Sequence, residues 1–81
     1  MVVVDPLPVV RAGLAMLIDD RPDMEVIAEA SSGEEALDLL RTHAPDVVLM
    51  DINMPGIGGL EATRRLLQKL PTARVIVVSM H

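Results

Sequence analysis

The fold of this chain is indicated most clearly by residues 47–56, which read VVLMDINMPG. Four large apolar residues in succession, without polar alternation, are typical of a strand that is covered on both faces of a parallel sheet. The run ends abruptly at Asp51, and a Pro-Gly loop follows. A carboxylate just past such a strand lies where open α/β sheets bind their ligands. Asp is also common at the start of turns, so the interpretation of Asp51 depends on the rest of the chain.

Three further segments are predicted as strands. Residues 1–4 form a short apolar run that ends at Asp5, and residues 74–78 form another that precedes Ser79. Residues 24–30 alternate glutamates with apolar residues, a pattern that favours a strand at the edge of a sheet.

Helix signals separate these strands. Apolar residues recur at helical spacing from Pro8 and predict one buried stripe up to about Asp20. Ser32 and Glu35 have the spacing of a capping box, in which Ser32 accepts a hydrogen bond from the Glu35 amide while the Glu35 carboxylate reaches back. A third helix is predicted over residues 58–70. Alternating strands and helices with short connections predict an α/β fold, a parallel sheet with helices on both faces.

Composition excludes several classes of function. The chain has 81 residues, which bounds it to one small domain, and a net charge of −5 without a basic cluster. It contains no Phe, Tyr or Trp, so both the basic footprint and the stacking platforms of nucleic-acid binding are missing. No apolar stretch is long enough to span a membrane and no secretory signal is recognisable. We therefore expect no nucleic-acid or membrane partner, and a cytoplasmic location.

Two groups of residues are assigned structural roles. The methionines are expected to fill gaps in the core; those considered are Met16, Met24, Met50, Met54 and Met80. The glycine-rich region at residues 56–59 has no phosphate-loop pattern, and we expect it to serve loop conformations with positive φ.

Polar residues at three strand ends predict a site. Asp5, Asp51 and Ser79 each follow an apolar strand, and parallel strands bring their carboxyl ends to one edge of the sheet. Two converging carboxylates repel each other, which favours a cation between them. A hard ion such as Mg²⁺ accepts carboxylates and a backbone carbonyl, here that of Asn53. Asp51 is then a candidate nucleophile for a phosphoryl group, and Ser79 a candidate donor to the phosphoryl oxygens.

The chain also resembles a known family. Five of its motifs are similar, in the same order, to those of the receiver domains of bacterial two-component response regulators: VVVD (2–5), VVRAGL (9–14), DVVLMD (46–51), MPGIGG (54–59) and VVS (77–79). The sequence around residues 11–13 and 58–61 is similar to that of the receivers joined to LuxR-type helix-turn-helix output domains. The resemblance implies a flavodoxin-like fold with strand order 2-1-3-4-5, of which this sequence supplies 2-1-3-4. It further implies phosphorylation of Asp51 by a sensor histidine kinase, with Ser79 moving toward the phosphoryl group on activation.

The sequence departs from the family in three respects. Receivers usually carry two adjacent acids after the first strand, whereas Asp5 is followed by Pro6, so one expected Mg²⁺ ligand is missing. The lysine of the fifth strand has no counterpart, and no output domain is present. We therefore expect residues 1–81 to be a partial receiver domain that lacks the fourth helix, fifth strand and fifth helix. The strand at residues 75–78 would then be an apolar open edge, which predicts a homodimer or an oligomer that is paired at this edge or swaps elements.

Two main interpretations of function remain open. In the first, the chain is a non-enzymatic phosphoacceptor that takes a phosphoryl group on Asp51, with Mg²⁺ held by Asp5, Asp51 and the Asn53 carbonyl, and so controls transcription through an output domain. In the second, it is a receiver-like interaction module in which phosphorylation is impaired, as Pro6 and the missing lysine suggest. A small α/β hydrolase is a weaker third option, because no nucleophile elbow or His–acid pair is present.

Overall fold

The structure is a computed structural model that describes residues 1–78; residues 79–81 lie outside the described part of the chain. Strands and helices alternate as the sequence predicts: β1 (Val2–Val4), α1 (Pro8–Asp19), β2 (Ala28–Ala30), α2 (Gly33–Leu39), β3 (Val47–Asp51), α3 (Gly58–Lys69) and β4 (Arg74–Val78). Neighbouring strands pair in parallel, and the strand order is β2-β1-β3-β4. The predicted α/β sheet and its order are therefore confirmed.

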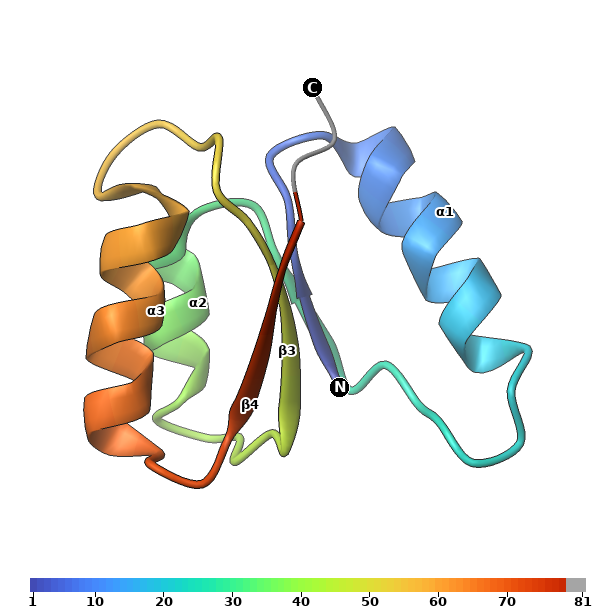
Figure 1. The fold of residues 1–81 in the computed structure, drawn as a ribbon. Helices are drawn as coiled ribbons and strands as arrows, with labels where there is room; N and C mark the ends of the chain where they lie inside the picture. The colour runs from blue at the N-terminus through green and yellow to red at the C-terminus, as the bar shows by residue number, and fades with distance from the viewer. Residues whose placement is uncertain (79–81) are drawn as a thin grey trace.

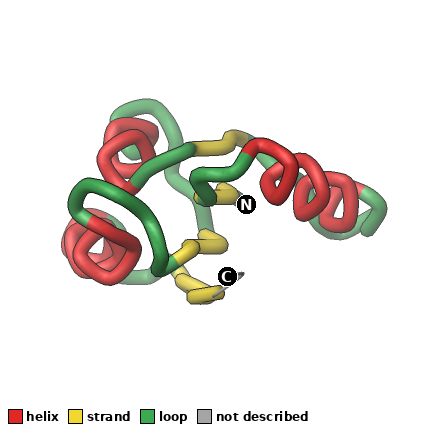
Figure 2. The backbone as a smooth tube through the Cα atoms, turned by 90° about the horizontal axis from the view of Figure 1, so that it is seen from above, coloured by secondary structure: helices red, strands yellow, loops and turns green. Residues whose placement is uncertain are grey.

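The sheet lies between two unequal helix layers. Helices α2 and α3 cover one face of the sheet, and α1 lies on the other (Figures 1 and 2). The main core forms between the sheet and the α2–α3 layer; its buried members are Val2, Val4, Ala30, Ala36, Val48, Met50, Ala62 and Leu66. Side chains alternate between the faces of a strand, so Val3, which is fully buried, faces the opposite layer.

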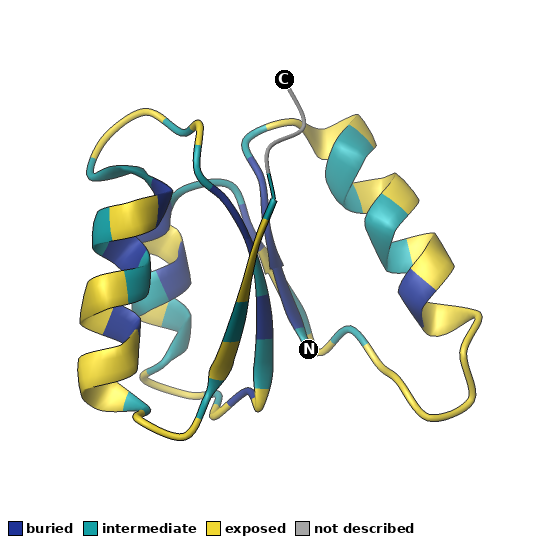
Figure 3. Cartoon of the chain, viewed as in Figure 1, coloured by how far each residue is buried: buried dark blue, intermediate teal, exposed yellow. Residues whose placement is uncertain are grey.

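The α1 layer and the β4 edge are much more open than the core (Figure 3). On α1, Ile18 is buried, as the predicted stripe requires, but Leu17 is 70% exposed and Met16 is 73% exposed. On β4, Ile76 is 49% exposed and Val77 is 44% exposed. In residues 1–78, β4 pairs with β3 and ends the sheet. An apolar edge strand of this kind is a template for pairing with another chain.

The predicted role of the methionines is correct for only some of them. Met50 is fully buried, and Met54 packs against the core. Met16 and Met24 are exposed, so their assignment to the core is wrong. Met16 lies on the part of α1 that no described element covers, and Met24 lies in the loop that precedes β2. Met80 lies outside the described residues.

Strand β2 lies at a sheet edge, as predicted, but it is shorter than the expected residues 24–30. Two backbone groups of the preceding segment are bound by a side chain or by the chain's amino terminus. The Val26 amide donates to Asp19 Oδ1 at 3.0 Å, and the Met1 ammonium donates to the Glu25 carbonyl at 2.7 Å. These contacts hold the segment as a loop that precedes the strand.

The start of α2 follows the predicted cap with one change of partner. Ser32 Oγ accepts from the Glu35 amide at 3.1 Å. The Glu35 carboxylate reaches back to Ser31 rather than Ser32, accepting from its hydroxyl at 2.7 Å and its amide at 3.3 Å. These hydrogen bonds from Ser31 lower the pKa of the Glu35 carboxyl. The cap fixes where α2 begins, directly beside the carboxyl edge of the sheet.

None of the helices in residues 1–78 has the length and apolar content needed to cross a membrane.

Candidate functional site

Asp5 and Asp51 lie next to each other at the carboxyl edge of the sheet. Strand β1 pairs with β3 so that Val4 is opposite Met50. Asp5 follows Val4, and Asp51 follows Met50. The parallel pairing therefore places both acids at the carboxyl edge of the sheet, which is the upper edge in Figure 1. Asp5 is 1% exposed and Asp51 is 0% exposed. Two buried acids on adjacent strands are the arrangement that the sequence predicted.

Each of these carboxylates accepts a hydrogen bond from the backbone two residues further on. The Leu7 amide donates to Asp5 Oδ1 at 2.8 Å, and the Asn53 amide donates to Asp51 Oδ1 at 2.9 Å. Such Asx turns are local and need no partner from another element. They fix the rotation of both carboxylates, and the second places the backbone of Asn53 directly beside Asp51.

The loop after β3 depends on two glycines with positive φ. Gly56 has φ 79° and Gly58 has φ 78°, the left-handed region that side chains other than glycine rarely adopt. The predicted role of the glycine-rich region is confirmed at these two positions. Glu34, in the first turn of α2, lies against Gly56, so the loop is held between the acids of the sheet and the start of α2.

Gly59 has a different role, which the sequence did not reveal. Its φ is not positive, so the expectation of a loop glycine is wrong there. A Cβ at this position would lie 2.7 Å from the Ile52 Cα and 2.9 Å from the Asp51 carbonyl carbon, and nearer still to the Asp51 carbonyl oxygen. The first turn of α3 therefore packs directly on the backbone of Asp51. A sequence signal exists in retrospect, since glycine in a helical turn that follows an apolar strand often marks close backbone approach.

The donor set at the edge fits a hard divalent cation. Burying two neighbouring carboxylates without compensation is costly, and Mg²⁺ is bound in proteins through one or two carboxylates while it keeps several waters. In residues 1–78, no cluster of three or more His, Cys, Asp or Glu side chains is arranged to hold a metal.

Ser79, the third member of the predicted site, lies outside the described residues, and its place relative to Asp51 stays a prediction. The last described residue of β4, Val78, accepts a hydrogen bond from the Ile52 amide at 3.2 Å through its carbonyl oxygen. The residue that follows Asp51 is thus tied to the end of β4.

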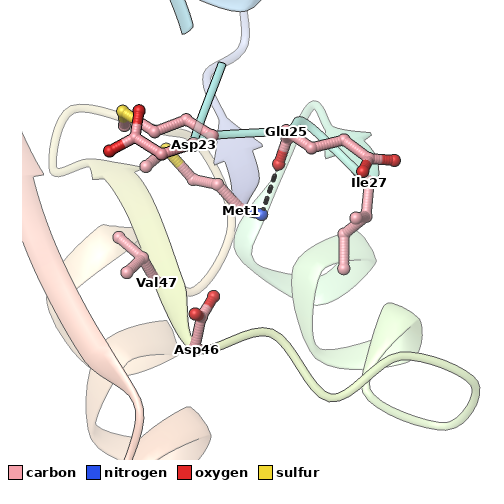
Figure 4. Close-up of a pocket in the computed structure, with 7 residues that line it drawn as sticks. Met1, Asp23, Glu25, Ile27, Asp46 and Val47 are labelled. Carbon is pink, nitrogen blue, oxygen red and sulfur yellow. Dashed lines mark hydrogen bonds between the residues drawn. The ribbon is translucent and has the colours of Figure 1, made fainter. Parts of the chain in front are cut away.

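A separate hollow of about 280 Å³ lies at the opposite end of the sheet (Figure 4). Its lining includes the acids Asp23, Glu25 and Asp46, together with Met1 and Met24. Asp46 immediately precedes β3, whereas Asp51 ends that strand. This hollow is therefore a feature distinct from the paired acids.

A parallel α/β sheet with two buried acids at adjacent strand ends has these acids where open α/β domains bind their ligands. The family of response regulator receiver domains matches residues 1–81. The chain belongs to this family.

Individual relatives agree with the assignment. The chain is 48% identical over 80 residues to the response regulator GacA of Pseudomonas aeruginosa, and 44% identical over 81 residues to the response regulator UvrY of Escherichia coli strain K12. These matches cover 99% and 100% of the chain but 37% of each relative. The chain thus spans about a third of the length of the curated relatives it matches.

Solved structures share the fold. A LuxR-family two-component response regulator from Aurantimonas sp. SI85-9A1 superposes with a TM-score of 0.91 at 45% identity, over 99% of this chain and 57% of that one. The complex of the P1 domain of CheA3 with CheY6 from R. sphaeroides contains a chain that superposes with a TM-score of 0.85 at 34% identity, over 99% of this chain and 62% of that one. The resemblance seen in the sequence is confirmed at the level of the family.

Proposed function

We propose that Asp51 is the phosphoacceptor of this receiver domain. The supporting observation is the pairing of two buried acids, Asp5 and Asp51, at adjacent strand ends. Burial removes Asp51 from competing solvent, and the Asn53 amide holds its carboxylate in one orientation. A carboxylate held in this way can act as a nucleophile.

The transfer we propose is a displacement at phosphorus. A carboxylate oxygen of Asp51 attacks the phosphorus of a phosphohistidine on a sensor kinase, and the P–N bond breaks. The bonding electron pair returns to the imidazole nitrogen, which takes up a proton, and Asp51 becomes an acyl phosphate. The chain supplies position rather than a further reacting group, which is how phosphoryl transfer is usually catalysed.

Asp5, Asp51 and the Asn53 carbonyl are the residues we propose as protein ligands of Mg²⁺. An ion held by these residues would neutralise charge on the incoming phosphoryl group. Pro6 contributes no carboxylate, so we expect the affinity for Mg²⁺ to be low. Ser79 is our candidate for the hydroxyl that donates to the phosphoryl oxygens. The added charge of about −1.5 to −2 would draw it toward Asp51 and change the surface beyond β4.

We base the proposed biological role on the names of the relatives. GacA and UvrY are named response regulators, and a relative from Brevibacillus brevis, 42% identical, is named a transcriptional regulatory protein. We propose that this receiver accepts its phosphoryl group from a sensor histidine kinase and controls the transcription of target genes through a DNA-binding output domain.

A small phosphodonor tests the assignment of the phosphoacceptor. The full-length protein is incubated with acetyl phosphate and Mg²⁺, and intact mass is measured. We expect one phosphoryl adduct that is lost in Asp51→Asn. The matched control is Asp46→Asn, because Asp46 lies at the other end of the same strand and is exposed. An adduct that persists in Asp51→Asn would contradict the assignment.

Pro6 favours a second candidate, a receiver-like interaction module in which phosphorylation is impaired. Pro6→Asp distinguishes the two candidates. If the site is a weakened phosphoacceptor, the new carboxylate should lower the dissociation constant for Mg²⁺ at least tenfold, about 1.4 kcal/mol, and speed adduct formation. Affinity unchanged by the substitution, together with no adduct in the parent, would favour the interaction module.

A further inference from the structure

The loop that carries Asp5 from β1 into α1 has few hydrogen-bond donors of its own. Residues 6 and 8 are prolines, which lack an N–H group. The remaining amides are both used: Asp5 N donates to the Ala30 carbonyl at 3.1 Å, and Leu7 N donates to Asp5 Oδ1 at 2.8 Å. The carbonyl groups are therefore the other hydrogen-bonding groups of this loop, and what binds them helps to fix the backbone that carries the Asp5 carboxylate.

Arg11 binds the carbonyl at the start of the loop. Its Nη1 donates to the Asp5 carbonyl at 2.7 Å, and its backbone amide donates to the Leu7 carbonyl at 3.1 Å. Together with the bond from Leu7 to Asp5, these contacts close a ring through three residues. A guanidinium donor makes a charge-assisted bond, which is stronger than a neutral one.

The environment of Arg11 keeps the guanidinium in place. Its side chain is 18% exposed, and Nε lies 3.4 Å from Glu29 Oε1 on the neighbouring strand β2. A poorly hydrated cation with a nearby carboxylate loses less hydration free energy when it binds a carbonyl than a free surface arginine would. Arg11 thus joins the first turn of α1, the end of β1 and the edge strand β2.

We infer that Arg11 is a positioning residue for Asp5, which holds the Asp5 carboxylate in its place at the carboxyl edge of the sheet, beside the end of β3. The part of this inference that concerns metal binding rests on the proposed function, whereas the part that concerns the position of the Asp5 carboxylate does not. Arg11 reaches Asp5 through the backbone carbonyl and is not a ligand or a reacting group. A purely structural ion pair with Glu29 is the competing explanation, and it predicts that Glu29→Gln and Arg11→Met have the same effect.

Three variants of the full-length protein separate these explanations. Arg11→Met removes the donor and retains an unbranched apolar stem, Arg11→Lys retains a charged donor, and Glu29→Gln removes only the ion pair. Amide hydrogen exchange of Leu7, measured by NMR, reports the bond to the Asp5 carboxylate. The Met50 amide in the central strand β3 reports global opening. Mg²⁺ affinity is read from shifts of the Leu7 and Asn53 amides, because residues 1–81 contain no Tyr or Trp that could report on this site by fluorescence.

In Arg11→Met we expect exchange at Leu7 to speed up about tenfold or more relative to Met50, as the loss of a charge-assisted hydrogen bond implies. Mg²⁺ affinity should fall by a similar factor, Arg11→Lys should restore part of both, and Glu29→Gln should change each less than threefold. Leu7 exchange in Arg11→Met within twofold of the parent, or equal to that of Glu29→Gln, would overturn the inference. If the parent binds no Mg²⁺ and forms no adduct, the proposed function fails, and Leu7 exchange still decides the role of Arg11.

Discussion

Gly59→Ala should both destabilise the fold and displace Asp51, the proposed phosphoacceptor. The added Cβ would lie 2.7 Å from the Ile52 Cα and 2.9 Å from the Asp51 carbonyl carbon, where ordinary van der Waals contact begins at 3.4 Å. The neighbouring atoms belong to the backbone, so no side chain can rotate out of the way. The start of α3 must move away from β3, or the end of β3 must shift.

The size of the effect follows from two opposing contributions. Forcing a methyl group into a packed region costs about 1–3 kcal/mol, while replacing glycine by alanine in a helix returns up to about 1 kcal/mol. The net loss should be about 1–2 kcal/mol, a large share of the stability of a small domain. The atoms that the new Cβ meets belong to Asp51 and Ile52, so a shift of the end of β3 would displace Asp51. Phosphoryl adduct formation should then also slow at least tenfold, since a displacement of about 1 Å can cost about 100-fold.

Two glycines provide matched controls. A Cβ on Gly13, within α1, would meet nothing within 4 Å, so Gly13→Ala should stabilise the protein by about 0.5–1 kcal/mol. Gly58 is also surrounded by open space but has φ 78°, so Gly58→Ala should cost about 1–2 kcal/mol through backbone strain alone.

Urea unfolding followed by far-ultraviolet circular dichroism measures all three variants, and intact mass measures the rate of adduct formation. The predicted order of stability is Gly13→Ala above the parent, with Gly58→Ala and Gly59→Ala below it. The adduct rate should fall most in Gly59→Ala. A Gly59→Ala protein as stable and as reactive as the parent would refute the argument, because α3 would then not pack tightly on the backbone of Asp51.

Two further predictions concern the surface. Hydrogen bonds from Arg64 and then Arg65 lower the pKa of Glu61 to about 2. Because the pKa is lower in the folded state than the ordinary 4.5, the contribution of Glu61 to stability is present above about pH 4.5 and is lost as the pH falls toward 2. An NMR titration of the Glu61 carboxyl should have its midpoint well below 4.5, and a midpoint at or above that value would contradict the assignment. The second prediction is that the 81-residue chain self-associates through the edge of β4, where Ile76 and Val77 are 49% and 44% exposed. Association would bury these side chains, and burial of apolar area stabilises the associated state by roughly 25 cal/mol per Å². Light scattering over a dilution series should reveal dimers or larger species that Ile76→Lys weakens, and a concentration-independent monomer would refute the claim.

The sequence alone determined the order of the strands and helices and the identity of the two paired acids. Both depend on local patterns. An apolar run as short as residues 47–50, followed by a Pro-Gly loop, is typical of a covered strand, and an acid placed directly after such a strand lies at the carboxyl edge of a parallel sheet. The motifs around Asp51 also sufficed to recognise the family, because they recur at fixed spacing along the chain.

Only the tertiary structure decided which residues hold those acids in place. The contact of Arg11 with the Asp5 carbonyl and the packing of Gly59 on Asp51 join separate elements, and neither leaves a periodic signal. The length of β2 was likewise decided by contacts from Asp19 and Met1. Local propensity specifies what an element can be, whereas these positions depend on where other elements pack, and that information exists only once the chain has folded.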